Sequence, residues 1–190
     1  MGNSFFKFKQ FIINQDKTAF KVGTDGVLLG ACAWLSDAKR ILDIGTGTGL
    51  IALMAAQRSD ADIVALEPDE ASYYQASENI NLCKWSRRIN LIRTGFKDYS
   101  LITTDKFDTI ITNPPFFRNS LKSPIYYKSI TRHADSLTSH EILEGAGRLL
   151  VDDGSLQLIL PFTEGSLFID EARKAGFYCN RLINVKPIAG

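Results

Sequence analysis

Short apolar runs alternate with longer amphipathic segments along this chain of 190 residues. The short runs, rich in Ile, Leu and Val, predict strands over residues 40–44, 63–67, 89–93, 107–112, 155–160 and 177–185. The longer segments predict helices over residues 27–35, 50–57, 138–150 and 163–175, and a further helix beginning at Pro68. This alternation predicts an α/β, Rossmann-like fold with a doubly wound, mostly parallel sheet. Ligands of such a sheet bind beyond the carboxyl ends of its strands.

Residues that favour helix ends occur at the edges of these segments. Thr24 or Asp25 is suited to capping the first helix, and Pro68 to opening a later one, where its missing N–H is tolerated. Residues 138–141 have the Thr-x-x-Glu pattern of a capping box. Gly176 is suited to closing the last helix in the left-handed conformation.

Composition and charge exclude several classes of protein. Hydrophobic residues make up 45% and charged residues 23%, no apolar run approaches the roughly 20 residues that span a bilayer, and no signal peptide is visible. Without repeats or linkers, we expect residues 1–190 to form a single domain. Cys32, Cys83 and Cys179 are widely spaced, which favours reduced thiols in the cytoplasm, and His133 and His140 are too isolated for a metal site. The net charge of +1 means that any RNA affinity must come from local patches.

A glycine-rich turn follows the first predicted strand, with the pattern D-x-G-x-G-x-G. It lacks the lysine of a phosphate-binding P-loop, and Asp43 would repel a pyrophosphate. Glu67 ends the second strand, where a doubly wound sheet places the carboxylate that binds ribose hydroxyls. An adenosine cofactor without phosphates and with a cationic end, S-adenosylmethionine, fits this pattern best. The cofactor-binding residues predicted here are Asp43, Gly45, Thr46, Gly47, Gly49 and Glu67.

The chemical motif follows the fourth predicted strand: Asn113, Pro114, Pro115 and Phe116. The Asn113 side-chain oxygen and the Pro114 carbonyl can each accept one N–H of an exocyclic amino group, which favours pyramidal attack on a methyl group. Pro115 stiffens the backbone, and Phe116 offers a flat face on which a flipped base stacks. The motif is similar to that of methyltransferases acting on adenine N6, guanine N2 or a glutamine side chain. Taken alone, the same four residues could form a surface turn.

Two stretches combine cations with aromatic rings. Residues 109–134 contain no Asp or Glu, and their aromatic residues are interleaved with the predicted RNA-binding residues Arg118, Lys122, Lys128 and Arg132. The N-terminus repeats this pattern, with Phe5, Phe6, Phe8 and Phe11 around Lys7 and Lys9. The alternatives are aromatic rings that pack on the core or, at the N-terminus, a lid.

Residues 43–50 resemble the first motif of class I S-adenosylmethionine-dependent methyltransferases, and Glu67 resembles their ribose-binding acid. The resemblance implies that Asp43 lies near the methionine amino end of the cofactor. It departs at the adenine-binding position, where Gly95 replaces the family's usual Asp. Backbone groups with Phe96, or else Asp98, are the candidates for holding the adenine.

A closer resemblance covers nearly the whole chain. Residues 8–11, 21–30 and 113–116 together are similar to the bacterial tRNA (adenine-N6)-methyltransferases, which modify the adenine 3′ of the anticodon in a valine tRNA. The resemblance implies that Lys21, Thr24 and Asp25 line the cofactor pocket. That family ends with a seventh, antiparallel strand, whereas this sequence stops after the sixth predicted strand, so we expect a truncated chain.

The leading hypothesis is therefore an S-adenosylmethionine-dependent tRNA adenine-N6 methyltransferase without a metal. Its substrate would be tRNA, it would not associate with membranes, and its oligomeric state is not predicted beyond a monomer by default. The alternatives are a methyltransferase for ribosomal RNA guanine N2 or protein glutamine, a nicotinamide-dependent oxidoreductase, or a non-catalytic S-adenosylmethionine-binding module. Hydride transfer has no use for residues 113–116, and an intact Asn113 argues against the last alternative.

Overall fold

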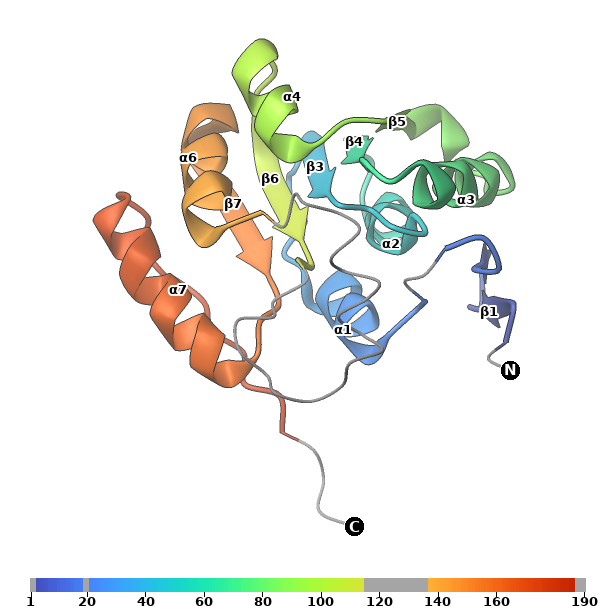
Figure 1. The fold of residues 1–190 in the computed structure, drawn as a ribbon, viewed down its shortest axis with the longest axis horizontal. Helices are drawn as coiled ribbons and strands as arrows, with labels where there is room; N and C mark the ends of the chain where they lie inside the picture. Colours follow the sequence, from blue (N-terminus) through green and yellow to red (C-terminus); the bar gives the residue numbers. More distant parts are fainter. Residues whose placement is uncertain (1–2, 19–20, 115–136, 187–190) are drawn as a thin grey trace.

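The computed structural model describes residues 3–18, 21–114 and 137–186, and its centre is a five-stranded parallel sheet (Figure 1). In the order β5-β4-β3-β6-β7, its strands are β5 (Ile89–Ile92), β4 (Asp62–Leu66), β3 (Arg40–Ile44), β6 (Phe107–Thr112) and β7 (Leu150–Leu158). Strands β1 (Phe5–Lys7) and β2 (Ile12–Asn14) form a separate antiparallel hairpin. The helices are α1 (Thr24–Cys32), α2 (Leu50–Arg58), α3 (Glu70–Asn81), α4 (Phe96–Ile102), α6 (Ser139–Leu149) and α7 (Phe162–Lys174), with a 3-10 turn η1 (Ser86–Arg88).

The strand order contains a reversal between β3 and β6. The chain runs outward from β3 through β4 to β5, then returns to place β6 on the other side of β3. Ile44 and Thr112, the last residues of these two strands, are register partners. The segments that follow β3 and β6 therefore start side by side, at the position where doubly wound sheets bind their ligands.

Both faces of the sheet are covered, as the apolar strands require. Ile41 of β3 packs in one cluster with residues of α1, α2 and α3, whereas Leu42, its neighbour, packs in a second cluster with α4 and α6. This alternation follows from the two-residue period of a strand. Phe168 of α7 packs outside α6 in a third, smaller cluster.

The predicted pattern of strands is largely confirmed, and the α/β fold with it. The predicted sixth strand, residues 177–185, is wrong: residues 177–186 form no strand, and most are exposed. A strand needs a neighbour to satisfy its backbone groups, and no other strand pairs with this segment in the described part of the chain. The hairpin and α4 were not predicted.

The observed helix ends confirm two of the predicted capping residues and contradict two others. Residues 138–141 form the predicted capping box, and Gly176 after α7 has φ 87°. Two predictions were wrong: α1 is preceded by Gly23 without a side-chain cap, and α3 starts after Asp69, whose carboxylate accepts from Ser72 N–H, rather than at Pro68. Among the described residues, no helix is both long and apolar enough to cross a bilayer.

Close packing of α6 on α4 gives a first prediction. A Cβ at Gly145 would lie 2.5 Å from a carbon of the Phe96 ring, which is buried and has no room to move. Gly145→Ala should therefore lower the free energy of unfolding by about 1–3 kcal/mol, the usual effect of overpacking. Gly147→Ala, on the same helix, is the control: its nearest neighbour would be 4.0 Å away, so a gain of about 0.5–1 kcal/mol is expected. Chemical denaturation measures both, and equal effects would contradict this packing.

Candidate active site

The glycine loop, residues 45–49, links β3 to α2 at the carboxyl end of the sheet. Gly45, Gly47 and Gly49 have φ values of 68°, 59° and 83°, a region that residues with a Cβ rarely adopt. Thr46 N–H donates to the Leu66 carbonyl (2.9 Å), which fastens the loop to the end of β4. The backbone conformation of the loop therefore explains why these three positions are glycine.

Asp43 lies beneath this loop and is 1% exposed. Its Oδ2 accepts from Thr46 Oγ1 (2.6 Å) and from Ala52 N–H (3.1 Å) in the first turn of α2. Its Oδ1 is buried and has no partner among the described residues. Burial raises the pKa of Asp43 to about 7; the two hydrogen bonds oppose this shift, and the charge of Glu67 adds to it. A buried acid with one unused oxygen is suited to a cationic group.

Glu67, directly after β4, is buried at the other side of the loop. Its Oε2 accepts from Gly47 N–H (2.8 Å) and its Oε1 from Asp69 N–H (3.0 Å). The carboxylate therefore joins the glycine loop to the start of α3.

Asn113 is exposed directly after β6, whereas Pro114 is buried. Helix α1 lies beside it, because a Cβ added at Gly26 would be 3.8 Å from Asn113 Nδ2 and 3.1 Å from a Leu50 methyl group. Glycine at position 26 thus avoids a tight contact with Leu50 and places α1 next to Asn113. The same helix begins with the exposed residues Thr24 and Asp25, whose predicted role in the cofactor pocket stays a prediction.

Within the described part of the chain, the remaining predicted cofactor residues form no hydrogen bond or ion pair with the glycine loop or with the two acids. Lys21 is exposed ahead of α1. Phe96 is 2% exposed, and its ring packs in the core against Gly145, which leaves no face of the ring for an adenine. Of the two predicted candidates, Asp98 is the exposed one, in the first turn of α4. Adenine binding by backbone groups near Gly95 or by Asp98 stays a prediction.

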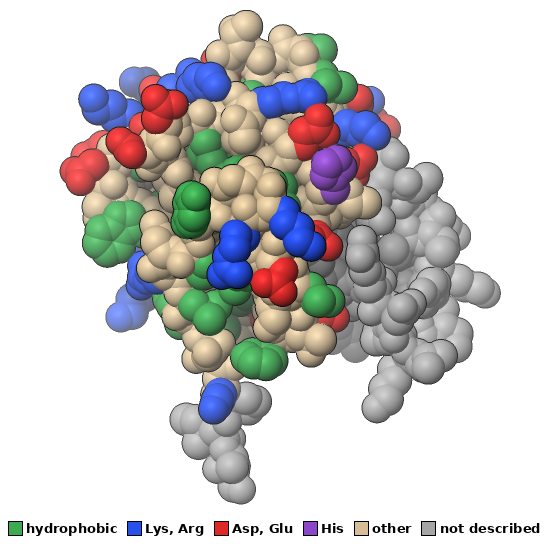
Figure 2. All heavy atoms as spheres, turned by 90° about the vertical axis from the view of Figure 1, so that its left-hand side faces the viewer, with side chains coloured by type: hydrophobic (Ala, Val, Ile, Leu, Met, Phe, Trp, Pro, Cys, Tyr) green, Lys and Arg blue, Asp and Glu red, His purple; other side chains and the backbone are tan. Residues whose placement is uncertain are grey.

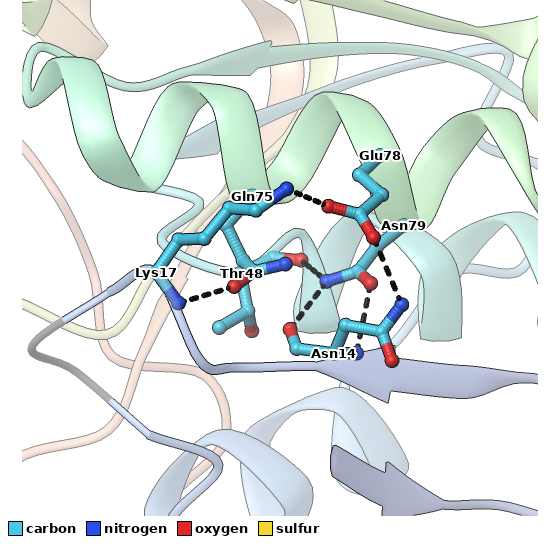
Figure 3. Close-up of polar contacts among 6 residues, drawn as sticks. All are labelled: Asn14, Lys17, Thr48, Gln75, Glu78 and Asn79. Carbon is cyan, nitrogen blue, oxygen red and sulfur yellow. Dashed lines mark hydrogen bonds and ion pairs between the residues drawn. The ribbon is translucent and has the colours of Figure 1, made fainter. Parts of the chain in front are cut away.

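A polar network around the buried Asn79, which sequence reasoning missed, connects the N-terminal segment to this site (Figure 3). Asn79 of α3 accepts from Asn14 N–H (2.8 Å) and donates to the Asn14 carbonyl (2.9 Å) and to the Thr48 carbonyl in the glycine loop (2.9 Å). Glu78 binds the Asn14 amide (3.3 Å) and forms an ion pair with Lys17. The Asn79 side chain therefore binds the glycine loop and the end of the hairpin at the same time.

Several predicted residues lie outside the described part of the chain. These are Pro115 and Phe116 of the chemical motif and the RNA-binding candidates Arg118, Lys122, Lys128 and Arg132. Their roles stay predictions.

The sheet order, the glycine loop and the two carboxylates define the class: a Rossmann-like methyltransferase. The chain belongs to the methyltransferase small domain family, which matches residues 23–165. It is 49% identical over 187 residues to the tRNA1(Val) (adenine(37)-N6)-methyltransferase of Bacteroides thetaiotaomicron, covering 97% of this chain and 78% of the relative. The protein of the same name from Trichodesmium erythraeum is 45% identical over 191 residues, covering 99% and 80%. The resemblance predicted from three short segments is confirmed.

Solved structures share the architecture. TrmN from Thermus thermophilus has a TM-score of 0.60 at 26% identity, and the match covers 83% of this chain and 43% of that one. A SAM-dependent methyltransferase from Agrobacterium tumefaciens has a TM-score of 0.63 at 16% identity, covering 92% and 59%, which shows a common fold.

The raised pKa of Asp43 gives a prediction for stability. Its pKa is about 7 in the folded protein and near 3.8 when unfolded, so the folded state holds the proton more tightly. Between about pH 4 and pH 7 this residue therefore makes the protein less stable as the pH rises. Asp43→Asn should remove that loss, which is on the order of 2 kcal/mol between pH 5 and pH 8. Denaturation of both proteins at the two pH values measures it; a difference between them that is independent of pH would contradict the shift.

Proposed function

We propose that this protein transfers a methyl group from S-adenosylmethionine to N6 of an adenine in tRNA. The observation that carries this proposal is the position of Asn113 and Pro114, which follow β6 where it pairs with β3, beside the loop held by Asp43 and Glu67. The names of the relatives favour the adenine 3′ of the anticodon in a valine tRNA as the target. Such a substrate would place the activity in the cytoplasm.

The residues present fit this cofactor. Asp43 has a buried oxygen without a partner among the described residues, and a raised pKa that a nearby cation would lower. The α-amino group of a methionine moiety is such a cation. Glu67 directly follows β4, where a doubly wound sheet places the acid that binds ribose hydroxyls, and two acids at the loop disfavour a phosphate-bearing cofactor. When bound, S-adenosylmethionine supplies an electrophilic methyl group on a positively charged sulfur.

Asn113 and Pro114 act on the nucleophile. The lone pair of an adenine amino group is delocalised into the ring, so the nitrogen attacks well only as it becomes pyramidal. The Asn113 side-chain oxygen and the Pro114 carbonyl each accept one of its N–H groups and stabilise that geometry. Pro114 is buried and has a fixed φ, which keeps both acceptors in place.

Two alternatives concern the acceptor. Guanine N2 and a glutamine amide offer the same pair of N–H groups, so the motif accepts them equally, and it is the named relatives that favour adenine. A nicotinamide-dependent oxidoreductase is disfavoured by the family of the chain. A non-catalytic binding module would have no use for an exposed asparagine beside the loop.

The cofactor site is tested with Glu67→Gln. This change keeps the size of the side chain but removes its charge and turns one acceptor oxygen into a donor, which cannot bond to Gly47 N–H or Asp69 N–H. Hydrogen bonds to charged groups contribute roughly 1.5–3 kcal/mol, so S-adenosylhomocysteine should bind about tenfold more weakly or worse.

The matched control is Glu70→Gln, the same chemical change at an exposed residue that forms an ion pair with Arg93. Isothermal titration calorimetry should show unaltered binding by this variant. If the two variants bind alike, the ribose lies elsewhere.

The chemistry is tested with Asn113→Ala. Because the acceptor matters most as the nitrogen turns pyramidal, kcat should fall by roughly 10²–10³, the usual effect of losing one preorganised group. Dissociation constants for tRNA and S-adenosylhomocysteine should stay within about twofold. Single-turnover assays with nucleoside analysis measure the rate and identify the product.

Asn81→Ala, at an exposed asparagine of α3, is the control and should be fully active. Near-normal turnover by Asn113→Ala would mean that residues 113–114 form a rigid turn without a catalytic role. A product methylated at guanine N2 would select the first alternative.

A further inference from the structure

We propose that the β1–β2 hairpin, together with residues 84–87, binds the RNA strand that leads to the target adenine. This inference rests on the proposed function, because it takes the substrate to be a tRNA. We call this region, residues 5–14 and 84–87, the hairpin surface.

The hairpin surface is joined to the active site through one buried side chain. Asn79 holds both backbone groups of Asn14 at the end of β2, and the same amide donates to the Thr48 carbonyl of the glycine loop (Figure 3). In Figure 1 the hairpin lies at the right-hand side of the molecule, below α3. A strand bound there can thus approach the loop that is proposed to hold the cofactor.

The charge of the hairpin surface suits a polyanion. Residues 1–15 and 79–97 contain no Asp or Glu, although the net charge of the whole chain is only +1. Lys7, Lys9, Lys84 and Arg87 are exposed there. Glu78, the acid that precedes the second stretch, is engaged by Lys17 and Asn14. Within the hairpin surface itself, phosphates therefore meet cations and no carboxylate, and the exposed Asp16 lies two residues beyond its end.

Aromatic rings accompany these cations. Phe5 and Phe6 of β1 are 51% and 44% exposed. Phe6 lies 4.9 Å from Phe8, which stacks on the buried Phe11 at 4.6 Å, and Phe11 contacts Trp85 at 6.1 Å. Phe6 is thus connected to the core through a continuous row of rings. Rigid exposed rings beside lysines are the means by which single-stranded RNA is bound.

The hairpin turn and residues 84–87 form one surface. Lys84 Nζ donates to Gln10 Oε1 (3.1 Å) and lies 4.9 Å from the centre of the Trp85 ring. Between the hairpin and the end of α3 is an open hollow of about 470 Å³, lined by Lys7, Lys9, Gln10, Asn14 and Leu82 among others. This hollow is large enough to accept a base or a sugar-phosphate unit.

The opposite side of the molecule lacks this separation of charge. Figure 2, which shows the side of α6 and α7, has acidic and basic side chains interspersed among the residues that are described. Arg148 pairs with Glu144 and Arg173 with Asp170 on these helices. Mixed charges of this kind give a polyanion no net attraction, so the two sides provide a natural comparison.

The test compares two triple variants of the full chain. In the first, Lys7→Ala, Lys9→Ala and Lys84→Ala remove three cations of the hairpin surface. In the control, Lys39→Ala, Lys106→Ala and Lys174→Ala remove three exposed lysines outside the hairpin surface, at the amino ends of β3 and β6 and at the end of α7. Both variants lose the same charge, so a nonspecific effect of net charge would appear in both.

Fluorescence anisotropy with a valine tRNA should show about tenfold weaker binding, or worse, for the first triple variant alone. The slope of log K against log salt should fall by about 2 in magnitude, since each phosphate contact on a single strand contributes roughly 0.7. Phe5→Ala with Phe6→Ala, which leaves the charge unchanged, should weaken binding about tenfold through lost stacking. Calorimetry with S-adenosylhomocysteine should give unchanged binding for every variant and shows that each is folded.

Equal tRNA affinity of the two triple variants would overturn the proposal. Loss of binding to vesicles of anionic phosphatidylserine, without loss of tRNA binding, would also overturn it and assign the surface to a membrane. The proposed function is judged separately, by whether the unmodified protein forms N6-methyladenosine in tRNA. A protein that binds tRNA through the hairpin but methylates another acceptor would retain this inference and lose the proposed function.

Discussion

Two buried carboxylates at neighbouring strand ends organise the whole site. Asp43 and Glu67 accept from backbone N–H groups on the loop, on α2 and before α3, so the path of the chain between β3 and α3 is set around them. The arrangement has an electrostatic cost, because each negative charge is desolvated and raises the energy of the other. A cationic ligand with hydroxyl groups offsets that cost. The same two acids that shape the loop are therefore the basis on which the cofactor site is proposed.

The position of Asn113 beside the glycine loop depends on where the sheet reverses its strand order. Because Ile44 and Thr112 are partners, the glycine loop and Asn113 emerge together although 68 residues separate those partners. Helix α1 packs beside Asn113 as well, and position 26 must stay small because a Cβ there would lie 3.1 Å from a Leu50 methyl group. Asn79 holds the loop from the opposite side and fixes the N-terminal segment against it. The proposed catalytic residues, the proposed cofactor site and the hairpin surface are thus arranged around the glycine loop.

Local signals predicted a large part of this arrangement. The runs at residues 40–44 and 107–112 are strands as predicted, because apolar β-branched runs of five or six residues have few alternatives in a buried sheet. The pattern D-x-G-x-G-x-G also indicated the conformation of the loop. Its three glycines have positive φ values, which other residues rarely adopt. Residues 177–185 have a similar apolar composition but form no strand, because strand formation also needs a neighbouring edge.

The sequence by itself determined the sheet, the glycine loop, the position of the two acids and the class of chemistry, because each depends on residues close together in the chain. Tertiary structure decided the rest. Ser72, Gln75 and Asn79 have the spacing of a solvent-facing polar stripe, yet they are buried because the N-terminal segment covers them. Phe96 follows the adenine-binding position in sequence but turns into the core against Gly145. Burial and partner choice depend on which distant segment packs on a residue, and no local pattern contains that information.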